Sequence, residues 1–167
     1  MRILVGLFRM AATTARARTT LFTTALATTA LVATALAVSA AADDNAVNYR
    51  KHTMDAVGGH MKALAAIAKG EVDHKDHLPV HVASLAALSR IAPDLFGVDS
   101  KTGADTDALP KIWEEPDVFK QRLDGFRTAA EDLDAVVASG DMTKFGAALG
   151  ALGKACKSCH DDFKKKE

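Results

Sequence analysis

The sequence has little cysteine, because Cys156 and Cys159 are the only two cysteines among its 167 residues. A structural zinc site needs about four ligands and usually a second cysteine pair, so this class of site is excluded. A thioredoxin-like redox dithiol follows a strand in a βαβ pattern, and no strand pattern precedes Cys156. The function of the pair has to be inferred from the residues around it.

Acidic residues are absent from the first 42 positions, whereas four arginines lie there: Arg2, Arg9, Arg16 and Arg18. An apolar run over residues 21–38 ends in small residues, which predicts a cleaved secretory signal peptide over residues 1–42, with cleavage after Ala40 or Ala42. A membrane anchor is the weaker alternative, because five threonines dilute the run. No Arg-Arg pair is present, so we expect the chain to cross the membrane unfolded and the mature protein, residues 43–167, to be periplasmic.

The charge of the mature chain is negative. All 21 acidic residues but only 17 of the 21 basic ones lie after residue 42, which leaves a net charge of −4. This balance argues against nucleic acid as a partner. About 125 residues are enough for one domain with one hydrophobic core.

Apolar residues recur at steps of three and four in four segments, the spacing of buried helix faces. The segments cover residues 45–69, 79–92, 116–139 and 142–163. Asp43 and Asp44 are suitable N-caps for the first helix, Pro79 suits the first turn of the second, Pro93 ends it, and Gly140 ends the third. We predict an all-α protein, an antiparallel four-helix bundle.

Two irregular stretches accompany these helices. Gly58 and Gly59 interrupt the first one, which predicts a bend or a close approach to the backbone. The link over residues 93–116 is long for a compact domain. Its apolar residues predict that it packs over one end of the helices: Leu95, Phe96, Ile112 and Trp113.

Three histidines, His74, His77 and His81, lie between the first two helices and at the start of the second. His77 and His81 could share one face of a helical turn, as metal-binding histidines do. No recognisable motif fixes a carboxylate or thiol beside them. We therefore favour a solvated loop and helix start over a metal site.

The last helix ends in the run Cys156-Lys157-Ser158-Cys159-His160. C-x-x-C-H is the attachment signature of a c-type haem, in which two thiols add to the porphyrin vinyl groups and the histidine binds the iron. We predict one covalent haem c per chain, held by Cys156 and Cys159, with His160 as an axial ligand. An ordinary disulfide or a free dithiol is the alternative.

With four helices, a long link and C-x-x-C-H near the end, the chain resembles the class II cytochromes c, the cytochrome c′ family. The resemblance rests on residues 49–50, 65–71, 95–96, 110–113 and 153–163. In high-spin cytochromes c′ a leucine or phenylalanine four residues after the arginine leaves the iron five-coordinate. Here Met54 holds that position, which resembles the low-spin cytochrome c-556 branch, where the methionine is the sixth ligand.

The resemblance therefore implies His160 and Met54 as axial ligands, with Arg50 near a haem propionate. A role for Met54 as core filler is the alternative, and Met61 is the competing ligand. With both axial positions filled, we expect a periplasmic one-electron carrier and no enzyme activity. The alternatives are a five-coordinate high-spin cytochrome c′ that binds nitric oxide or carbon monoxide, and a helical interaction protein without haem.

The expected partners are redox proteins that the sequence does not identify. A cluster of lysines near the haem edge is a docking surface for an acidic partner in this interpretation: Lys157, Lys164, Lys165 and Lys166. The resemblance also implies homodimers, because family members often pair through their first helices.

Overall fold

The computed structural model describes residues 23–97, 100–101 and 106–166, and side chains from residue 43 onward. The chain divides into two compact units, residues 1–38 and 39–167. In the first unit the backbone is helical from Thr23 onward, and the rest of the predicted signal peptide lies outside the described residues. The second unit begins at Ser39, slightly before the boundary expected at residue 43.

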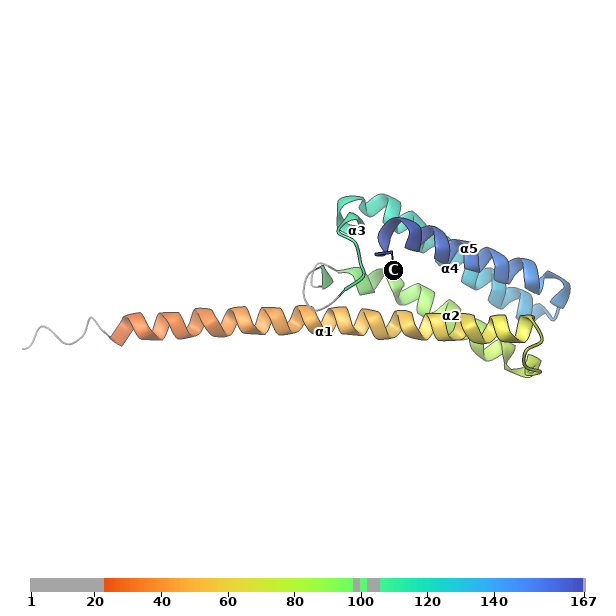
Figure 1. The fold of residues 1–167 in the computed structure, drawn as a ribbon, viewed down its shortest axis with the longest axis horizontal. Helices are drawn as coiled ribbons and strands as arrows, with labels where there is room; N and C mark the ends of the chain where they lie inside the picture. The colour runs from red at the N-terminus through yellow and green to blue at the C-terminus, as the bar shows by residue number, and fades with distance from the viewer. Residues whose placement is uncertain (1–22, 98–99, 102–105, 167) are drawn as a thin grey trace, which may run out of the picture. The chain divides into compact units, whose positions relative to one another are not determined.

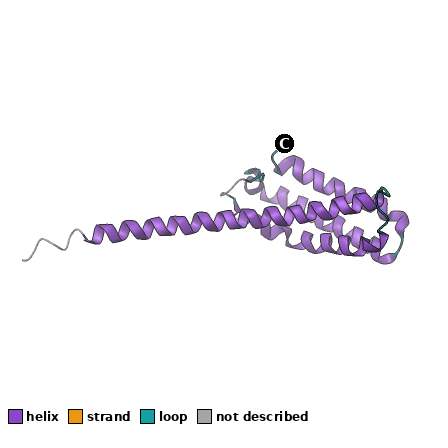
Figure 2. Ribbon diagram, turned by 60° about the horizontal axis from the view of Figure 1, so that its bottom comes forward, coloured by secondary structure: helices purple, strands orange, loops and turns teal. Residues whose placement is uncertain are grey.

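Along the described residues the chain forms five α-helices (Figure 1). They are α1 (Thr23–Ala68), α2 (Leu78–Ile91), α3 (Lys111–Glu114), α4 (Pro116–Ser139) and α5 (Phe145–Phe163). In the second unit the end of α1 lies beside α2, α4 and α5, and Figure 2 shows the same bundle from another side. The predicted all-α four-helix bundle is confirmed. Of the helices in the described part, none is long and apolar enough to span a membrane.

The core of the bundle receives side chains from all four long helices. Each contributes one fully buried leucine: Leu64, Leu85, Leu133 and Leu152. Burying such a side chain stabilises the fold by about 1.5–3 kcal/mol. All four leucines lie on the apolar stripes that the sequence spacing predicts, so the buried faces of the helices follow from local sequence.

The start of the first helix differs from the prediction. Asp43 and Asp44, expected as N-caps, lie inside α1, which begins at Thr23. A capping residue has non-helical dihedral angles, and its side chain accepts hydrogen bonds from the first backbone N–H groups of the helix. Where a preceding helical turn exists, its carbonyl groups accept these hydrogen bonds instead. The alanines at positions 40–42 are strong helix formers and continue the helix into the aspartates, so no cap is needed there.

The end of α1 is close to where the sequence places it. Gly70 has a φ of 73°, a conformation that glycine adopts without steric cost. Its N–H donates to the Ile67 carbonyl and the Glu71 N–H donates to the Ala66 carbonyl, both at 3.0 Å. This pair of hydrogen bonds is the Schellman motif, which satisfies the free carbonyl groups at the end of a helix.

Proline and glycine set the predicted limits of the other helices. Pro79 lies in the first turn of α2, and Pro116 is the first residue of α4. Gly140, with a φ of 74°, caps α4 and donates to the Val137 carbonyl at 3.1 Å. These signals are local, which is why sequence alone locates them.

The link between α2 and α4 packs over one end of the bundle, as predicted. Leu95 and Ile112 are buried, and the Trp113 indole N–H donates to the Phe96 carbonyl at 3.0 Å. The link also holds the end of α5, because the Leu109 N–H donates to the Phe163 carbonyl at 3.0 Å. The end of α5 that carries the C-x-x-C-H run is therefore fixed by the link as well as by the core.

Candidate cofactor site

The C-x-x-C-H run lies in the last two turns of α5. Cys156 and Cys159 are three residues apart, which places their side chains on one face of the helix. Both are free, half-buried and packed against the hydrophobic core. His160 follows directly, with an exposed side chain. The structure thus brings two thiols and one imidazole together along one stretch of helix.

Burial changes the acidity of both thiols. It raises the pKa of Cys156, and it raises the pKa of Cys159 to about 11, although the nearby positive charge of Arg122 acts in the opposite direction. At neutral pH both side chains are therefore protonated in the folded bundle. A thiol is a much weaker nucleophile than a thiolate, so the closed bundle opposes addition of these thiols to another molecule.

The imidazole of His160 is neutral at neutral pH. Although its side chain is exposed overall, desolvation by the atoms around the ring lowers its pKa, and the charge of Lys164 lowers it further, while Asp161 acts the other way. The neutral imidazole carries the free lone pair that a metal ion requires. His160 is thus available as a ligand without first losing a proton.

An ion pair holds α5 against α4 beside the cysteines. The Arg122 guanidinium donates through Nε at 3.3 Å and Nη2 at 3.0 Å to one carboxylate oxygen of Asp162. Both side chains are about one-third exposed. Because the two residues lie on neighbouring helices, this pair opposes sliding of α5 past α4 at the position of Cys159.

Two of the four lysines expected to dock a partner already lie near carboxylates. The Lys157 ammonium lies 2.6 Å from Asp161, one turn along α5, and the Lys164 ammonium lies 3.6 Å from Asp107. The docking role of the lysine cluster stays a prediction.

Three phenylalanine rings connect the end of α5 to the link. Phe163 is buried and meets Phe119 edge to face, with ring centres 5.1 Å apart. Phe119 in turn meets Phe96 at 4.8 Å in the same geometry. Edge-to-face pairs of this kind contribute about 0.5–1.5 kcal/mol beyond the area they bury. They fix the residues that follow His160.

Arg50 lies at the far side of this aromatic row and is only 3% exposed. Its guanidinium donates to the Ser100 carbonyl at 2.8 Å and the Thr106 hydroxyl at 2.7 Å, and it lies 5.3 Å from the centre of the Phe96 ring. Burial lowers its pKa. Among the described residues no carboxylate pairs with it. The structure therefore gives Arg50 a role that sequence reasoning missed, which is to tie the link to α1.

We expect Arg50→Met to lower the free energy of unfolding by about 1.5–3 kcal/mol, because hydrogen bonds to a charged group contribute about that much. Denaturant unfolding of the holoprotein measures the loss. Arg90→Met is the matched control, because the Arg90–Glu131 ion pair is exposed and such pairs contribute at most about 1 kcal/mol. Equal losses in the two variants would show that Arg50 does not hold the link.

One face of α1 carries two methionines with a glycine between them. Met54 and Met61 are half-buried and pack against the core. Gly58 lies between them on the same face, and a Cβ added there would meet no neighbouring atom within 4 Å. The helix runs through Gly58 and Gly59 without interruption. Within the described residues the glycine pair leaves room beside α1, and no other segment closely approaches it.

These observations fit a covalently attached haem. The donor set contains two free thiols on one helical face, a neutral imidazole in the next position and apolar neighbours. A thiol pair and an imidazole are the groups that attach c-type haem and bind its iron.

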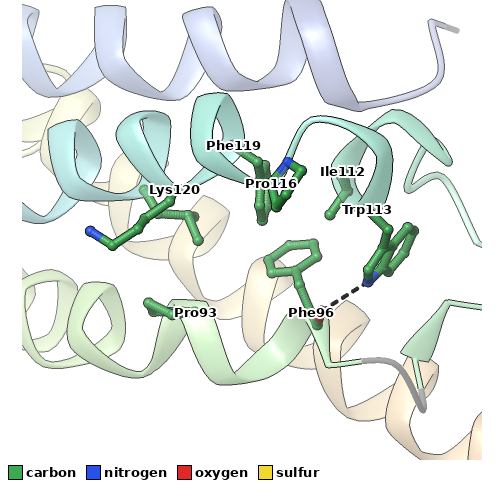
Figure 3. Close-up of a pocket in the computed structure, with 8 residues that line it drawn as sticks. Pro93, Phe96, Ile112, Trp113, Pro116, Phe119 and Lys120 are labelled. Atoms are coloured by element: carbon green, nitrogen blue, oxygen red, sulfur yellow. Dashed lines mark hydrogen bonds between the residues drawn. The ribbon is translucent and has the colours of Figure 1, made fainter.

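A separate small cavity opens between the link and α4 (Figure 3). Its volume is about 250 Å³. It is lined by Pro93, Phe96, Ile112, Trp113, Pro116, Phe119, Lys120 and Leu123. None of the predicted haem-binding residues lines it, and its volume is below the roughly 300–1,000 Å³ of typical small-molecule sites. We therefore assign no ligand to this cavity.

The comparisons with known proteins agree with this donor set. The family model described as "Cytochrome C'" matches residues 45–164. A cytochrome c′ from Pararhodospirillum photometricum is 35% identical over 125 residues, 75% of this chain and 100% of that protein. The crystal structure of cytochrome c′ from Rubrivivax gelatinosus has a TM-score of 0.69 and 32% identity, covering 74% of this chain and 97% of that one.

A third similar structure holds a ligand. It is a ferrous variant of cytochrome c prime from Alcaligenes xylosoxidans with bound NO, with a TM-score of 0.66 and 32% identity. The match covers 94% of that chain and 73% of this one.

The predicted six-coordinate, low-spin His160/Met54 electron carrier is wrong. The similar proteins described above are cytochromes c′, one of them with bound NO, and the cytochrome c-556 branch is not supported. The reason for the error is that a methionine on an apolar stripe has the same spacing whether it binds iron or fills space. Sequence spacing does not separate these two roles.

Proposed function

The chain belongs to the cytochrome c′ family, and on that basis we propose that it binds nitric oxide or carbon monoxide at a five-coordinate haem iron. Its cofactor is haem c, the covalent haem of this family. The observation that carries the proposal is the likeness to a cytochrome c prime with bound NO, together with a donor set in which His160 is the one histidine of the C-x-x-C-H run.

In this proposal three residues of α5 hold the cofactor. Cys156 and Cys159 would attach the haem through thioether bonds, and His160 would bind the iron on one face. When bound, the haem supplies an iron centre that coordinates a diatomic ligand. The raised pKa values of the thiols support attachment before the bundle closes, while both cysteines are in water and ionise more readily.

The residues of α1 would control the other face of the iron. Met54 and Met61 present apolar atoms there, and a Cβ added at Gly58 between them would meet no neighbouring atom within 4 Å. An apolar surface excludes water and offers no hydrogen bond to a charged ligand. These surroundings would therefore favour the binding of small uncharged molecules, such as nitric oxide and carbon monoxide.

Arg50 would assist through its charge. Its guanidinium is buried and has no paired carboxylate among the described residues, and a buried cation is costly without an anion nearby. A haem propionate would supply that anion. The same arginine would then connect the cofactor to the link through Ser100 and Thr106.

The visible spectrum of the purified holoprotein tests the proposal. We expect a broad high-spin ferric spectrum, and a ferrous form that binds carbon monoxide and nitric oxide. Met54→Leu nearly conserves volume, so it should cost less than about 1.5 kcal/mol of stability and leave the high-spin spectrum unchanged.

Two outcomes would contradict the proposal. One is a low-spin spectrum with a ferrous form that excludes carbon monoxide. The other is a spectrum that becomes high-spin only after Met54→Leu, which would mean that the thioether had been bound to iron. Met61→Leu is the control for a methionine of the same helix face.

We place this activity in the periplasm, with the signal peptide over residues 1–42 removed after Ala40 or Ala42. The role is ligand binding rather than catalysis. Pairing of two chains through α1 agrees with the exposure of Tyr49 on that helix, which is 60%.

A further inference from the structure

Four of the six histidines of the chain lie at one end of the bundle. His60 is in α1, His74 and His77 are in the turn after it, and His81 is in the first turns of α2. Figure 1 shows this α1–α2 turn at the end of the second unit away from the C-terminus, where α5 ends. The histidines are therefore separate from the haem-binding residues of α5.

Two of these histidines face each other across the helix pair. The Nδ1 atoms of His60 and His81 are 2.9 Å apart, and the two ring centres are 5.2 Å apart at an angle of 63°. Both side chains are half-buried. Because one belongs to α1 and the other to α2, the packing of the two helices fixes this contact.

A third histidine lies one helical turn before His81. His77 ends a short 3-10 helix (Lys75–His77) and comes directly before α2, with φ and ψ of −86° and −12° in the right-handed helical region. Residues four apart on a helix are neighbours on its surface, and a pair of histidines at this spacing is the zinc-binding arrangement of helical metalloprotease motifs. The His77 ring is exposed, so it would have to leave its present neighbours and turn toward His81 to bind the same metal.

The surroundings of His77 also contain an acidic group. The Asp76 carboxylate lies 3.6 Å from His77 Nε2, and the His74 ring stacks on His77 with centres 4.7 Å apart. Donor atoms of His74, Asp76 and His77 lie within 4.8 Å of one another. A carboxylate beside a ligating histidine orients the ring and raises its basicity.

We propose that His60, His77 and His81 form a binding site for a divalent transition-metal ion, copper(II) in particular, that joins α1 to α2. Neutral imidazoles are good ligands for copper, zinc and nickel. With metal–nitrogen bonds of about 2.0–2.1 Å, the 2.9 Å between the two Nδ1 atoms corresponds to an angle of about 90° at the metal.

An angle of about 90° at the metal favours copper(II). A right angle between nitrogen ligands is typical of tetragonal copper(II) and nickel(II), whereas zinc(II) prefers a tetrahedral site, and copper(II) binds most tightly in the divalent series. His77 would supply the third nitrogen and water the remaining positions. The ring that donates the proton in the metal-free pair would move it from Nδ1 to Nε2, so the change of tautomer releases no net proton.

Copper(II) binding to untagged holoprotein tests this site. We expect about one copper(II) per chain in equilibrium dialysis, an electron paramagnetic resonance signal with nitrogen hyperfine structure, and a higher thermal unfolding midpoint because only the folded chain brings the helices together. Zinc(II) should bind more weakly. Removal of the haem is not needed, because the copper signal is distinct from that of ferric haem.

Four variants decide where the metal lies. His60→Gln and His81→Gln should each weaken copper binding at least about tenfold, since even the loss of an outer-shell partner costs 10–100-fold, and should abolish the rise in unfolding midpoint. His52→Gln, on another face of α1, should change neither. Unchanged affinity in His60→Gln would overturn the proposal, and so would a loss in His74→Gln as large as that in His60→Gln, because the metal would then lie on the exposed turn alone.

Discussion

A chain that carries both Cys156→Ala and Cys159→Ala is expected to contain no covalent haem when it is isolated from the periplasm. Thioether bonds need the cysteine sulfur atoms, and these are the only two in the chain. Haem staining after denaturing electrophoresis measures the loss, which should be complete. Each single substitution should leave one thioether and therefore a reduced signal.

Ser158→Ala is the matched control for this experiment. Ser158 lies between the two cysteines, and its hydroxyl donates to the Ala155 carbonyl of the same helix, at 3.1 Å. Haem staining of this variant should equal that of the wild type. Staining that survives the double cysteine substitution would contradict attachment at α5.

The second large effect is expected from His160→Ala. Both thioethers remain, so the haem should stay attached, but the iron loses the imidazole that the chain supplies. We expect a large change in the Soret band and the ferric spectrum. Imidazole added to the solution should restore much of the wild-type spectrum, because it can occupy the vacated coordination position.

The control here is His52→Ala, an exposed histidine in α1 that the proposal does not use. Its spectrum should not change. If His160→Ala also leaves the spectrum unchanged, another residue binds the iron, and the assignment of the C-x-x-C-H histidine is incorrect.

Interactions between distant residues were the part that the sequence could not predict. The propionate role expected for Arg50 stays a prediction, but its hydrogen bonds to Ser100 and Thr106, 50 and 56 positions away, were not foreseen. The same limit applies to His60 and His81, whose contact joins α1 and α2. The spacing of His77 and His81 was visible in the sequence, but the third imidazole across the helix pair was not.

Local sequence was enough to predict the helices other than the start of the first one, their buried faces and the attachment signature. The burial of Leu133 and Leu152 could be predicted because apolar spacing is a local property. The end of α4 at Gly140 could be predicted because glycine favours a left-handed cap. The attachment signature is local too, because its cysteines and histidine lie within five consecutive residues. The surroundings of these residues follow from the packing of the helices. It gives the cysteines half-buried positions against the core, places Phe163 on Phe119 and brings His60 to His81. Such contacts depend on how helices pack, and packing is set by all the helices together rather than by any one segment.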